Sequence, residues 1–167
     1  YWVSYAGIVQ LFGGKPVVVA TDEQKGWKVE LSALEKAFSK KTKLLFINNA
    51  GNPTGALYSR DELAAILALA KQHDVVVVSD EVYSGLTYEG EFVSAASFLE
   101  YADRAVVIQS CSKHFAMTGW RVGFMFGPPE LVKMSPCSRA RVPQGRRVSV
   151  SGRRWRRSSM RMRLFRR

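Results

Sequence analysis

Three polar clusters in the sequence hold the residue types that could do chemistry. The clusters are residues 49–55, 79–83 and 109–113, and each one follows a short apolar run. Together they offer an amide, a carboxylate, a phenol, hydroxyl groups and an ammonium group. If the clusters meet in space, this set of groups matches the requirements of a phosphorylated pyridine aldehyde.

Short apolar runs come before the clusters and predict buried strands. Unbroken, mostly β-branched runs of this length suit strands that are covered on both faces, as in a mostly parallel sheet. We expect strands at five such runs, which are residues 17–20, 44–47, 75–78, 105–108 and 122–126.

Helix signals lie between the apolar runs. Ser4 could cap a first helix near the start of the chain. Two capping boxes, in which a serine precedes a glutamate by three residues, predict helices that begin at Ser32 and Ser59. The first of these helices would carry Ile8, Leu11 and Phe12 as its apolar residues. The last would carry Leu63, Ile66, Leu67 and Ala70 on one face.

The order of these elements predicts an α/β fold, with helices on both faces of a mostly parallel sheet. In open sheets of this kind, ligands bind beyond the carboxyl ends of the parallel strands. The polar clusters at 49–55, 79–83 and 109–113 come at these ends. We therefore expect the three clusters to converge on one rim of the sheet.

The positive charge is confined to the end of the chain. The 167 residues carry a formal net charge of +11. Residues 1–134 hold 13 Lys and Arg against 14 Asp and Glu, whereas residues 135–167 hold 12 Arg, no Lys and no acidic residue. The high net charge therefore says nothing about the partners of residues 1–134, which we expect to form one domain.

Residues 135–167 form an Arg-rich tail that we expect to be disordered, and three interpretations of it stay open. Hydrophobic periodicity ends beyond Met134, and arginine occurs in pairs. The tail contains no lysine, and it has no acidic residue to balance the positive charge. A GC-rich gene read out of frame gives such a composition, so the tail could be a non-native frameshift product. It could instead be a nucleic-acid-binding tail or a solvated tail without a partner.

Other residue types bear on location and on metal binding. No apolar run reaches 18 residues, so no transmembrane helix is expected. Cys111 and Cys137 fall in different regions and form no disulfide framework, which fits a reducing, cytoplasmic setting. His73 and His114 have no partners at metal-ligand spacing, so no metal site is predicted.

Four motifs occur in an order and spacing that carry a family resemblance. They are Tyr-Trp-Val-Ser-Tyr at 1–5, Asn-Pro-Thr-Gly at 52–55, Ser-Asp-Glu-Val-Tyr at 79–83, and a segment at 110–123 that begins Ser-Cys-Ser-Lys. Together they resemble class I aminotransferases of pyridoxal 5'-phosphate (PLP) fold type I, in the aspartate aminotransferase-like branch. The match spans residues 1–134, so the resemblance implies a fragment of the large PLP-binding domain.

The resemblance implies that Lys113 is the catalytic residue. It would form an aldimine with PLP and then carry the proton between the substrate Cα and the cofactor C4′. Without the motifs, a lysine at a strand end is usually a surface charge. Asp80 would face the pyridine nitrogen and keep it protonated, although an aspartate here also suits a helix N-cap. Trp2 would stack on the pyridine ring, whereas a terminal tryptophan alone is more often a packing residue.

The other cofactor-binding residues follow from the same resemblance. Asn52 and Tyr83 would hydrogen-bond the phenolic oxygen of PLP. Taken alone, the first suits a turn and the second suits a core aromatic. Ser110 and Arg121 would hold the phosphate group, and Ser112 would assist them.

The activity implied by the resemblance is transfer of an amino group from an α-amino acid to a 2-oxo acid, in a family whose members are dimers. The match ends near Met134, and no motif supplies the family's arginine that grips the substrate α-carboxylate. We therefore expect little or no turnover from this chain. Two alternatives stay open: a PLP-dependent lyase similar to aminocyclopropane-carboxylate synthase, and a non-catalytic fragment whose Arg-rich tail binds nucleic acid.

Overall fold

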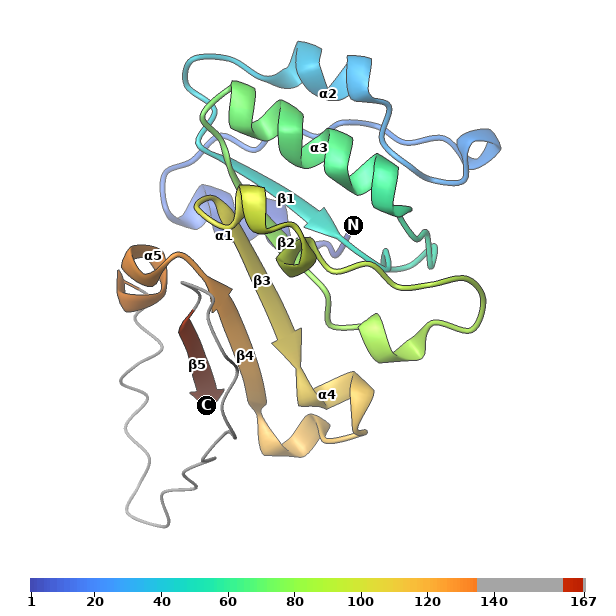
Figure 1. Cartoon of the computed structure of the whole chain (residues 1–167), viewed down its shortest axis with the longest axis vertical. Helices are drawn as coiled ribbons and strands as arrows, with labels where there is room; N and C mark the ends of the chain where they lie inside the picture. Colours follow the sequence, from blue (N-terminus) through green and yellow to red (C-terminus); the bar gives the residue numbers. More distant parts are fainter. Residues whose placement is uncertain (135–160, 167) are drawn as a thin grey trace.

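The computed structural model describes residues 1–134 and 161–166 of the chain. These residues contain a five-stranded sheet in which the strand order follows the sequence (Figure 1). Strands β1 to β4 confirm four of the five predicted strands. The strands are β1 (Leu44–Asn48), β2 (Val76–Asp80), β3 (Ala105–Ser110), β4 (Val122–Gly127) and β5 (Arg161–Arg166).

Strands β1, β2 and β3 run parallel to one another. Asn48 at the end of β1 is opposite Asp80 of β2, and Asp80 is opposite Ile108 of β3. The helix α3 (Arg60–Gln72) supplies the long crossover that parallel neighbours such as β1 and β2 need. The carboxyl ends of the three strands therefore lie at the same rim of the sheet.

Strand β4 runs antiparallel to β3, with Ser110 opposite Gly123 and Val107 opposite Phe126. The cause is the short connection, because only residues 111–121 separate the two strands. A crossover to a parallel neighbour needs about a dozen residues or more, usually with a helix that spans the sheet. The sheet is thus mixed, with a group of three parallel strands at its start.

Strand β5 corrects the expectation that the whole Arg-rich tail is disordered. Its six residues pair antiparallel with β4, from Val122 opposite Arg166 to Gly127 opposite Arg161. Without β5, β4 would be an edge strand with unpaired backbone N–H and C=O groups. The backbone of residues 161–166 pairs with these groups. The other residues of the tail, 135–160 and 167, lie outside the described residues.

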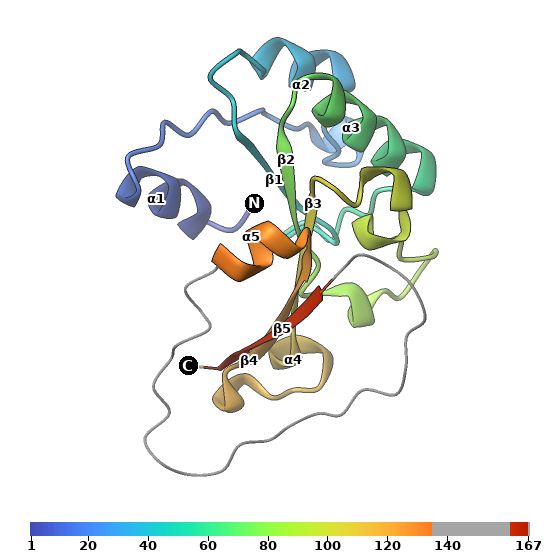
Figure 2. The same cartoon turned by 60° about the vertical axis from the view of Figure 1, so that its left-hand side comes forward.

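The helices cover both faces of the sheet, as predicted. Figure 2 shows α1 and α5 on one side of the strands and α2 and α3 on the other. Besides α3, the α-helices of the described residues are α1 (Ser4–Leu11), α2 (Leu31–Ala37), α4 (Cys111–His114) and α5 (Pro129–Met134). The arrangement confirms the α/β fold expected from the sequence.

One of the three predicted helix starts is confirmed. The hydroxyl oxygen of Ser59 accepts from the backbone N–H of Glu62, and the Glu62 carboxylate accepts from the backbone N–H of Ser59. The prediction for Ser32 is wrong, because Glu30 already has the extended backbone of an N-cap and α2 begins at Leu31. The prediction that Ser4 caps a helix is also wrong, because Ser4 is the first residue of α1 and the N-cap is Val3.

The apolar run at residues 17–20 does not form a strand, so this prediction is wrong. An apolar run forms a strand only where a neighbouring strand can pair with it, and no strand of the described residues pairs with this one. Val17 and Val18 are 63% and 58% exposed, and only Val19 of this run packs against the core.

The hydrophobic core lies between α3 and the parallel strands. Leu63, Ile66, Leu67 and Ala70 of α3 are buried with Val77 and other strand residues. The predicted apolar face of α1 is not buried, because Leu11 and Phe12 are 79% and 83% exposed. None of the helices in residues 1–134 combines the length and the apolar character needed to cross a membrane.

Candidate functional site

The predicted polar clusters meet at the carboxyl ends of β1, β2 and β3. The side-chain amide of Asn48 and the backbone N–H of Asn49 both donate to the backbone oxygen of Asp80, each at 3.0 Å. The backbone N–H of Glu81 donates to the backbone oxygen of Ile108 at 2.9 Å. These bonds join the starts of the polar clusters, so the predicted convergence on one rim is confirmed.

The carboxylate of Asp80 is half-buried at this rim and accepts two hydrogen bonds. Its Oδ1 accepts from the backbone N–H of Val82 at 3.2 Å. Its Oδ2 accepts from the hydroxyl group of Tyr5, which lies 75 residues earlier in the chain. The two bonds fix the orientation of the carboxylate beyond the end of β2.

Tyr5 is a site residue that the sequence analysis did not identify. Its ring stacks on Phe46 of β1, with ring centroids 5.7 Å apart and an interplanar angle of 19°. Burial raises the pKa of the Tyr5 phenol, and the hydrogen bond to Asp80 and the negative charge of Asp80 raise it further. Tyr5 therefore stays protonated and acts as a donor to Asp80.

Trp2 lies next to this pair. Its ring meets the ring of Tyr5 edge to face, with centroids 5.8 Å apart and an interplanar angle of 81°. Trp2 remains 49% exposed, so much of its ring surface is open to a flat ligand. The start of α1 thus brings an indole ring and a phenol to the side of the rim that carries Asp80.

A second group joins one residue from each of the three polar clusters. Asn52 donates from Nδ2 to the hydroxyl oxygen of Tyr83 at 3.3 Å. The ammonium group of Lys113 lies over the ring of Tyr83, 5.8 Å from its centroid. The backbone N–H of Asn52 donates to Oδ1 of Asn48 at 2.8 Å, which anchors the loop to β1. An amide, a phenol and an amine from distant segments therefore lie side by side.

The last residue of β3 and the loop between β3 and β4 supply the remaining predicted residues. The hydroxyl of Ser110 accepts from the backbone N–H of Ser112 at 3.0 Å and donates to the backbone oxygen of Val122 at 3.4 Å. Arg121 is exposed, and its Nη1 donates to the backbone oxygen of Thr118 at 3.0 Å. The backbone at Arg121 has a φ of 51°, which turns the chain into β4.

The contact between His114 and Gly85 packs this loop against the turn that follows Tyr83. A Cβ atom at Gly85 would lie 2.2 Å from Nε2 of His114, so only glycine permits this approach. The ring of His114 also stacks on Phe115, with centroids 4.8 Å apart. His114 therefore has a structural role in the packing of this loop. Cys111, which directly follows β3, is a buried free thiol.

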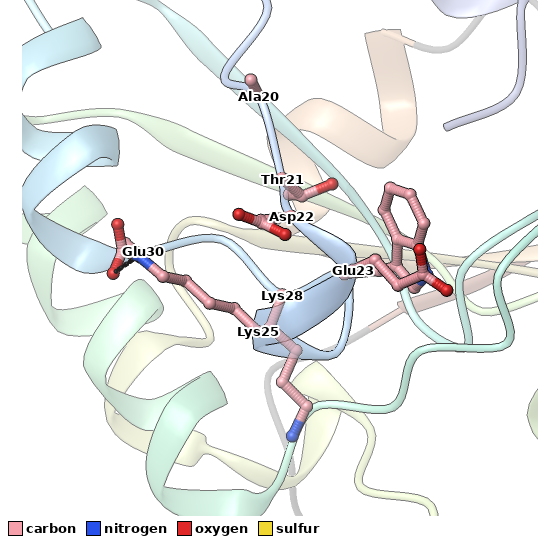
Figure 3. A pocket seen from close by; sticks show the side chains of 8 residues that line it. Ala20, Thr21, Asp22, Glu23, Lys25, Lys28 and Glu30 are labelled. Atoms are coloured by element: carbon pink, nitrogen blue, oxygen red, sulfur yellow. Dashed lines mark hydrogen bonds and ion pairs between the residues drawn. The ribbon is translucent and has the colours of Figure 1, made fainter.

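A surface hollow elsewhere in the chain contains none of the predicted site residues (Figure 3). Two ion pairs occupy its wall and its edge, Lys25 with Glu30 at 2.6 Å and Lys28 with Glu62 at 2.7 Å. The hollow is lined by Ala20, Thr21, Asp22, Glu23, Lys25, Trp27, Lys28 and Glu30. Both lysines of the hollow are thus paired with carboxylates, and the rim remains the better candidate for a ligand site.

The chemistry of the side chains at the rim fits PLP. Asp80 offers a carboxylate for a ring nitrogen, and Lys113 offers an amine for an aldehyde carbon. The pair of Asn52 and Tyr83 offers hydrogen bonds to a phenolic oxygen, and Trp2 offers a flat aromatic surface. Ser110 lies opposite Gly123 of β4 and Arg121 directly precedes that strand, and a hydroxyl and a guanidinium are groups that bind phosphate.

Comparison with known proteins agrees with this interpretation. A sequence model of the family described as "Aminotransferase class I and II" matches residues 1–137. The chain is 47% identical over 127 residues to "Putative aminotransferase YugH" of Bacillus subtilis, covering 76% of this chain and 33% of the relative. It is 42% identical over 135 residues to an aspartate aminotransferase of the same organism, covering 80% of this chain and 34% of the relative.

Solved structures give the same result. The aspartate aminotransferase from Thermus thermophilus with maleate superposes with a TM-score of 0.77 at 40% identity, over 80% of this chain and 34% of that protein. An aromatic aminotransferase from Pyrococcus horikoshii superposes with a TM-score of 0.76, also at 40% identity, over 79% of this chain and 36% of that protein. This chain thus spans about a third of the length of the proteins that it matches.

Proposed function

Because the chain belongs to the family of class I and II aminotransferases, we propose that it is part of an enzyme that transfers an amino group from an α-amino acid to a 2-oxo acid with PLP as cofactor. One observation supports the proposal above the others. The ammonium group of Lys113 lies over the ring of Tyr83, which is itself hydrogen-bonded to Asn52. This places an accessible amine at the strand rim beside hydrogen-bonding groups from two other segments.

Each residue of the proposed site has a distinct task. When bound, PLP supplies an electron sink that stabilises negative charge at the substrate Cα. The Nζ atom of Lys113 would hold the cofactor and, as a free amine, would move the proton at the substrate Cα. The carboxylate of Asp80 holds a proton at the pyridine nitrogen, because a nearby negative charge favours the protonated form of that nitrogen.

The other residues bind and orient the cofactor. Asn52 and Tyr83 hydrogen-bond its phenolic oxygen, and Trp2 stacks on its ring. The phosphate group is bound by Ser110, Ser112 and Arg121, of which the arginine supplies a planar set of donors.

The extent of the family match supports a division of the chain. We propose that residues 1–134 are a partial PLP-binding large domain and that residues 135–167 are an Arg-rich, non-native tail. The family match ends at residue 137, close to this boundary. Sequencing the parent locus tests the frameshift interpretation, because an uninterrupted native reading frame through residues 135–167 would contradict it.

The proposal also covers the setting of the whole protein. The buried free thiol of Cys111 supports a cytoplasmic, reducing location. The family match supports small-molecule substrates, an amino acid and a 2-oxo acid. The homodimer that we propose as the assembly follows only from the resemblance to this family. We expect this chain alone to give little turnover, because it covers about a third of each relative. Robust conversion of 2-oxoglutarate to glutamate by the purified chain would contradict this expectation.

Borohydride trapping tests the proposed role of Lys113. The purified chain is mixed with PLP, reduced, digested and examined by mass spectrometry. We expect one phosphopyridoxyl group on the peptide that carries Lys113, and loss of this modification in Lys113→Ala. Lys133→Ala is the matched control, since Lys133 is an exposed lysine outside the site. Labelling that is equal in all three proteins, or absent from the folded parent chain, would refute the role.

A further inference from the structure

Glu81 is a buried carboxylate next to the rim, and the proposed reaction does not use it. Its exposure is 0%, although it directly follows the half-buried Asp80. Burial raises the pKa of the Glu81 carboxyl, and the hydrogen bonds that it accepts oppose this effect. A buried carboxylate is costly unless it is well hydrogen-bonded, so its partners indicate what it does.

The partners of Glu81 come from three different segments. Oε1 accepts from the backbone N–H of Ala95 at 2.8 Å and from the hydroxyl of Ser79 at 3.0 Å. Oε2 accepts from Nε2 of Gln109 at 3.4 Å. The side-chain oxygen of Gln109 in turn accepts from the hydroxyl of Ser84 at 3.1 Å. Within residues 1–134, the carboxylate has neutral donors and no ion pair.

This network links the segments that carry the proposed cofactor residues. Glu81 follows Asp80, Ser84 follows Tyr83, and Gln109 precedes Ser110 in the sequence. The two hydrogen bonds of Gln109 therefore tie the end of β2, the turn after it and the end of β3 to one another. A packed apolar side chain at position 81 would avoid the cost of burying a carboxylate, but it could not make these links.

We propose that Glu81 is a positioning residue of the cofactor site, which sets the spacing of Asp80, Tyr83 and Ser110 through Gln109 and Ser84. The inference rests on the proposed function, because it assigns those residues to PLP. Glu81 itself does not touch the cofactor. It acts through the network, and its loss should therefore weaken PLP binding, whereas a loss of stability elsewhere in the chain should not.

The test compares PLP affinity with stability in matched variants. Glu81→Leu removes the network at its centre, and we expect the Kd for PLP to rise about tenfold, the cost of losing one or two buried hydrogen bonds. Glu81→Gln should restore most of the affinity. Its amide oxygen can still accept from Ala95, and its amide nitrogen can donate to a Gln109 side chain that has turned over.

Tyr58→Phe is the control for a general loss of stability. Tyr58 is buried, and its hydroxyl accepts from the backbone N–H of Val29 at 3.1 Å, away from the network. We expect urea unfolding to show lower stability in this variant, with the Kd for PLP within about twofold of the parent. If Glu81→Leu also keeps its Kd within that range, the positioning role is wrong.

Two further measurements cover other outcomes. If Glu81→Leu does not fold, Ser84→Ala removes only the outer link of the network, and an unchanged Kd in that variant overturns the proposal.

If the parent chain binds no PLP, the proposed function fails for this chain, and backbone hydrogen exchange then tests the network alone. We expect Glu81→Leu to accelerate exchange at Val82 and Ser112 as well as at Ala95. Faster exchange at Ala95 alone would overturn the positioning role.

Discussion

Replacing Tyr5 with phenylalanine isolates the hydrogen bond that links the start of the chain to the strand rim. Tyr5→Phe removes only the hydroxyl that donates to Oδ2 of Asp80. The phenylalanine ring can keep the stack on Phe46 and the edge contact with Trp2. Any change in stability therefore reports the hydrogen bond rather than the packing of the ring.

The expected magnitude follows from the surroundings of Asp80. A hydrogen bond to a charged group contributes about 1.5–3 kcal/mol. Asp80 is only half-buried and keeps its bond from the backbone N–H of Val82, and water can reach the oxygen that Tyr5 leaves. We therefore expect Tyr5→Phe to lower the free energy of unfolding by about 1–2 kcal/mol at pH 7.

The raised pKa of the Tyr5 phenol also predicts that the free energy of unfolding depends on pH in the alkaline range. In the unfolded chain the phenol of Tyr5 ionises near its ordinary pKa of 10.0, whereas in the folded chain burial and Asp80 raise its pKa. Above pH 10 the folded state thus binds more protons than the unfolded state, so stability falls as the pH rises. The contribution of Tyr5 to stability is fully present below pH 10 and is lost as the pH rises above it. This part of the alkaline loss of stability should be absent from Tyr5→Phe.

Urea unfolding followed by circular dichroism at pH 7 and at pH 11 measures both effects. Tyr88→Phe is the matched control, because Tyr88 is 90% exposed. We expect this control to match the parent chain at both pH values. The explanation is refuted if Tyr5→Phe differs from the control by less than about 0.5 kcal/mol at pH 7 and loses as much stability at pH 11 as the parent.

Four other substitutions test three features of the fold by the same unfolding measurement. Ser59→Ala removes the cap of α3 and should lower stability by about 1 kcal/mol, whereas no loss would mean that the capping box contributes nothing. Leu67→Ala should cost about 2–5 kcal/mol, because Leu67 is fully buried, and a loss below 1 kcal/mol would contradict a packed core. Gly85→Ala should cost about 1 kcal/mol, as its Cβ meets the ring of His114, and His114→Ala should relieve that loss.

The strands and the main helix were predictable because their signals are local. The apolar run before each polar cluster and the capping box at Ser59 depend on residues within a few positions of each other. The run at 17–20 has the same local signal but finds no strand to pair with among the described residues, and pairing depends on distant segments. The direction of β4 could have been predicted, since eleven residues are too few for a crossover.

The site residues also divide into those that local signals predicted and one that only the fold identifies. The positions of Asp80, Tyr83 and Lys113 after strands allowed their convergence to be predicted, and the structure brings Asn52, Tyr83 and Lys113 together. Tyr5 was missed because its partner lies 75 residues away and no periodicity links the two. A signal was present, since Tyr5 belongs to the motif at residues 1–5, but only the fold shows which carboxylate it meets.

The short connection between β3 and β4 also bears on how the chain folds. Paired residues of β3 and β4 are as few as 13 positions apart, as for Ser110 and Gly123, whereas Leu44 of β1 and its partner Val76 are 32 positions apart. Closing the shorter loop costs roughly 0.8 kcal/mol less chain entropy. We therefore expect the hairpin that carries Lys113 to form early in folding, before the parallel strands assemble beside it.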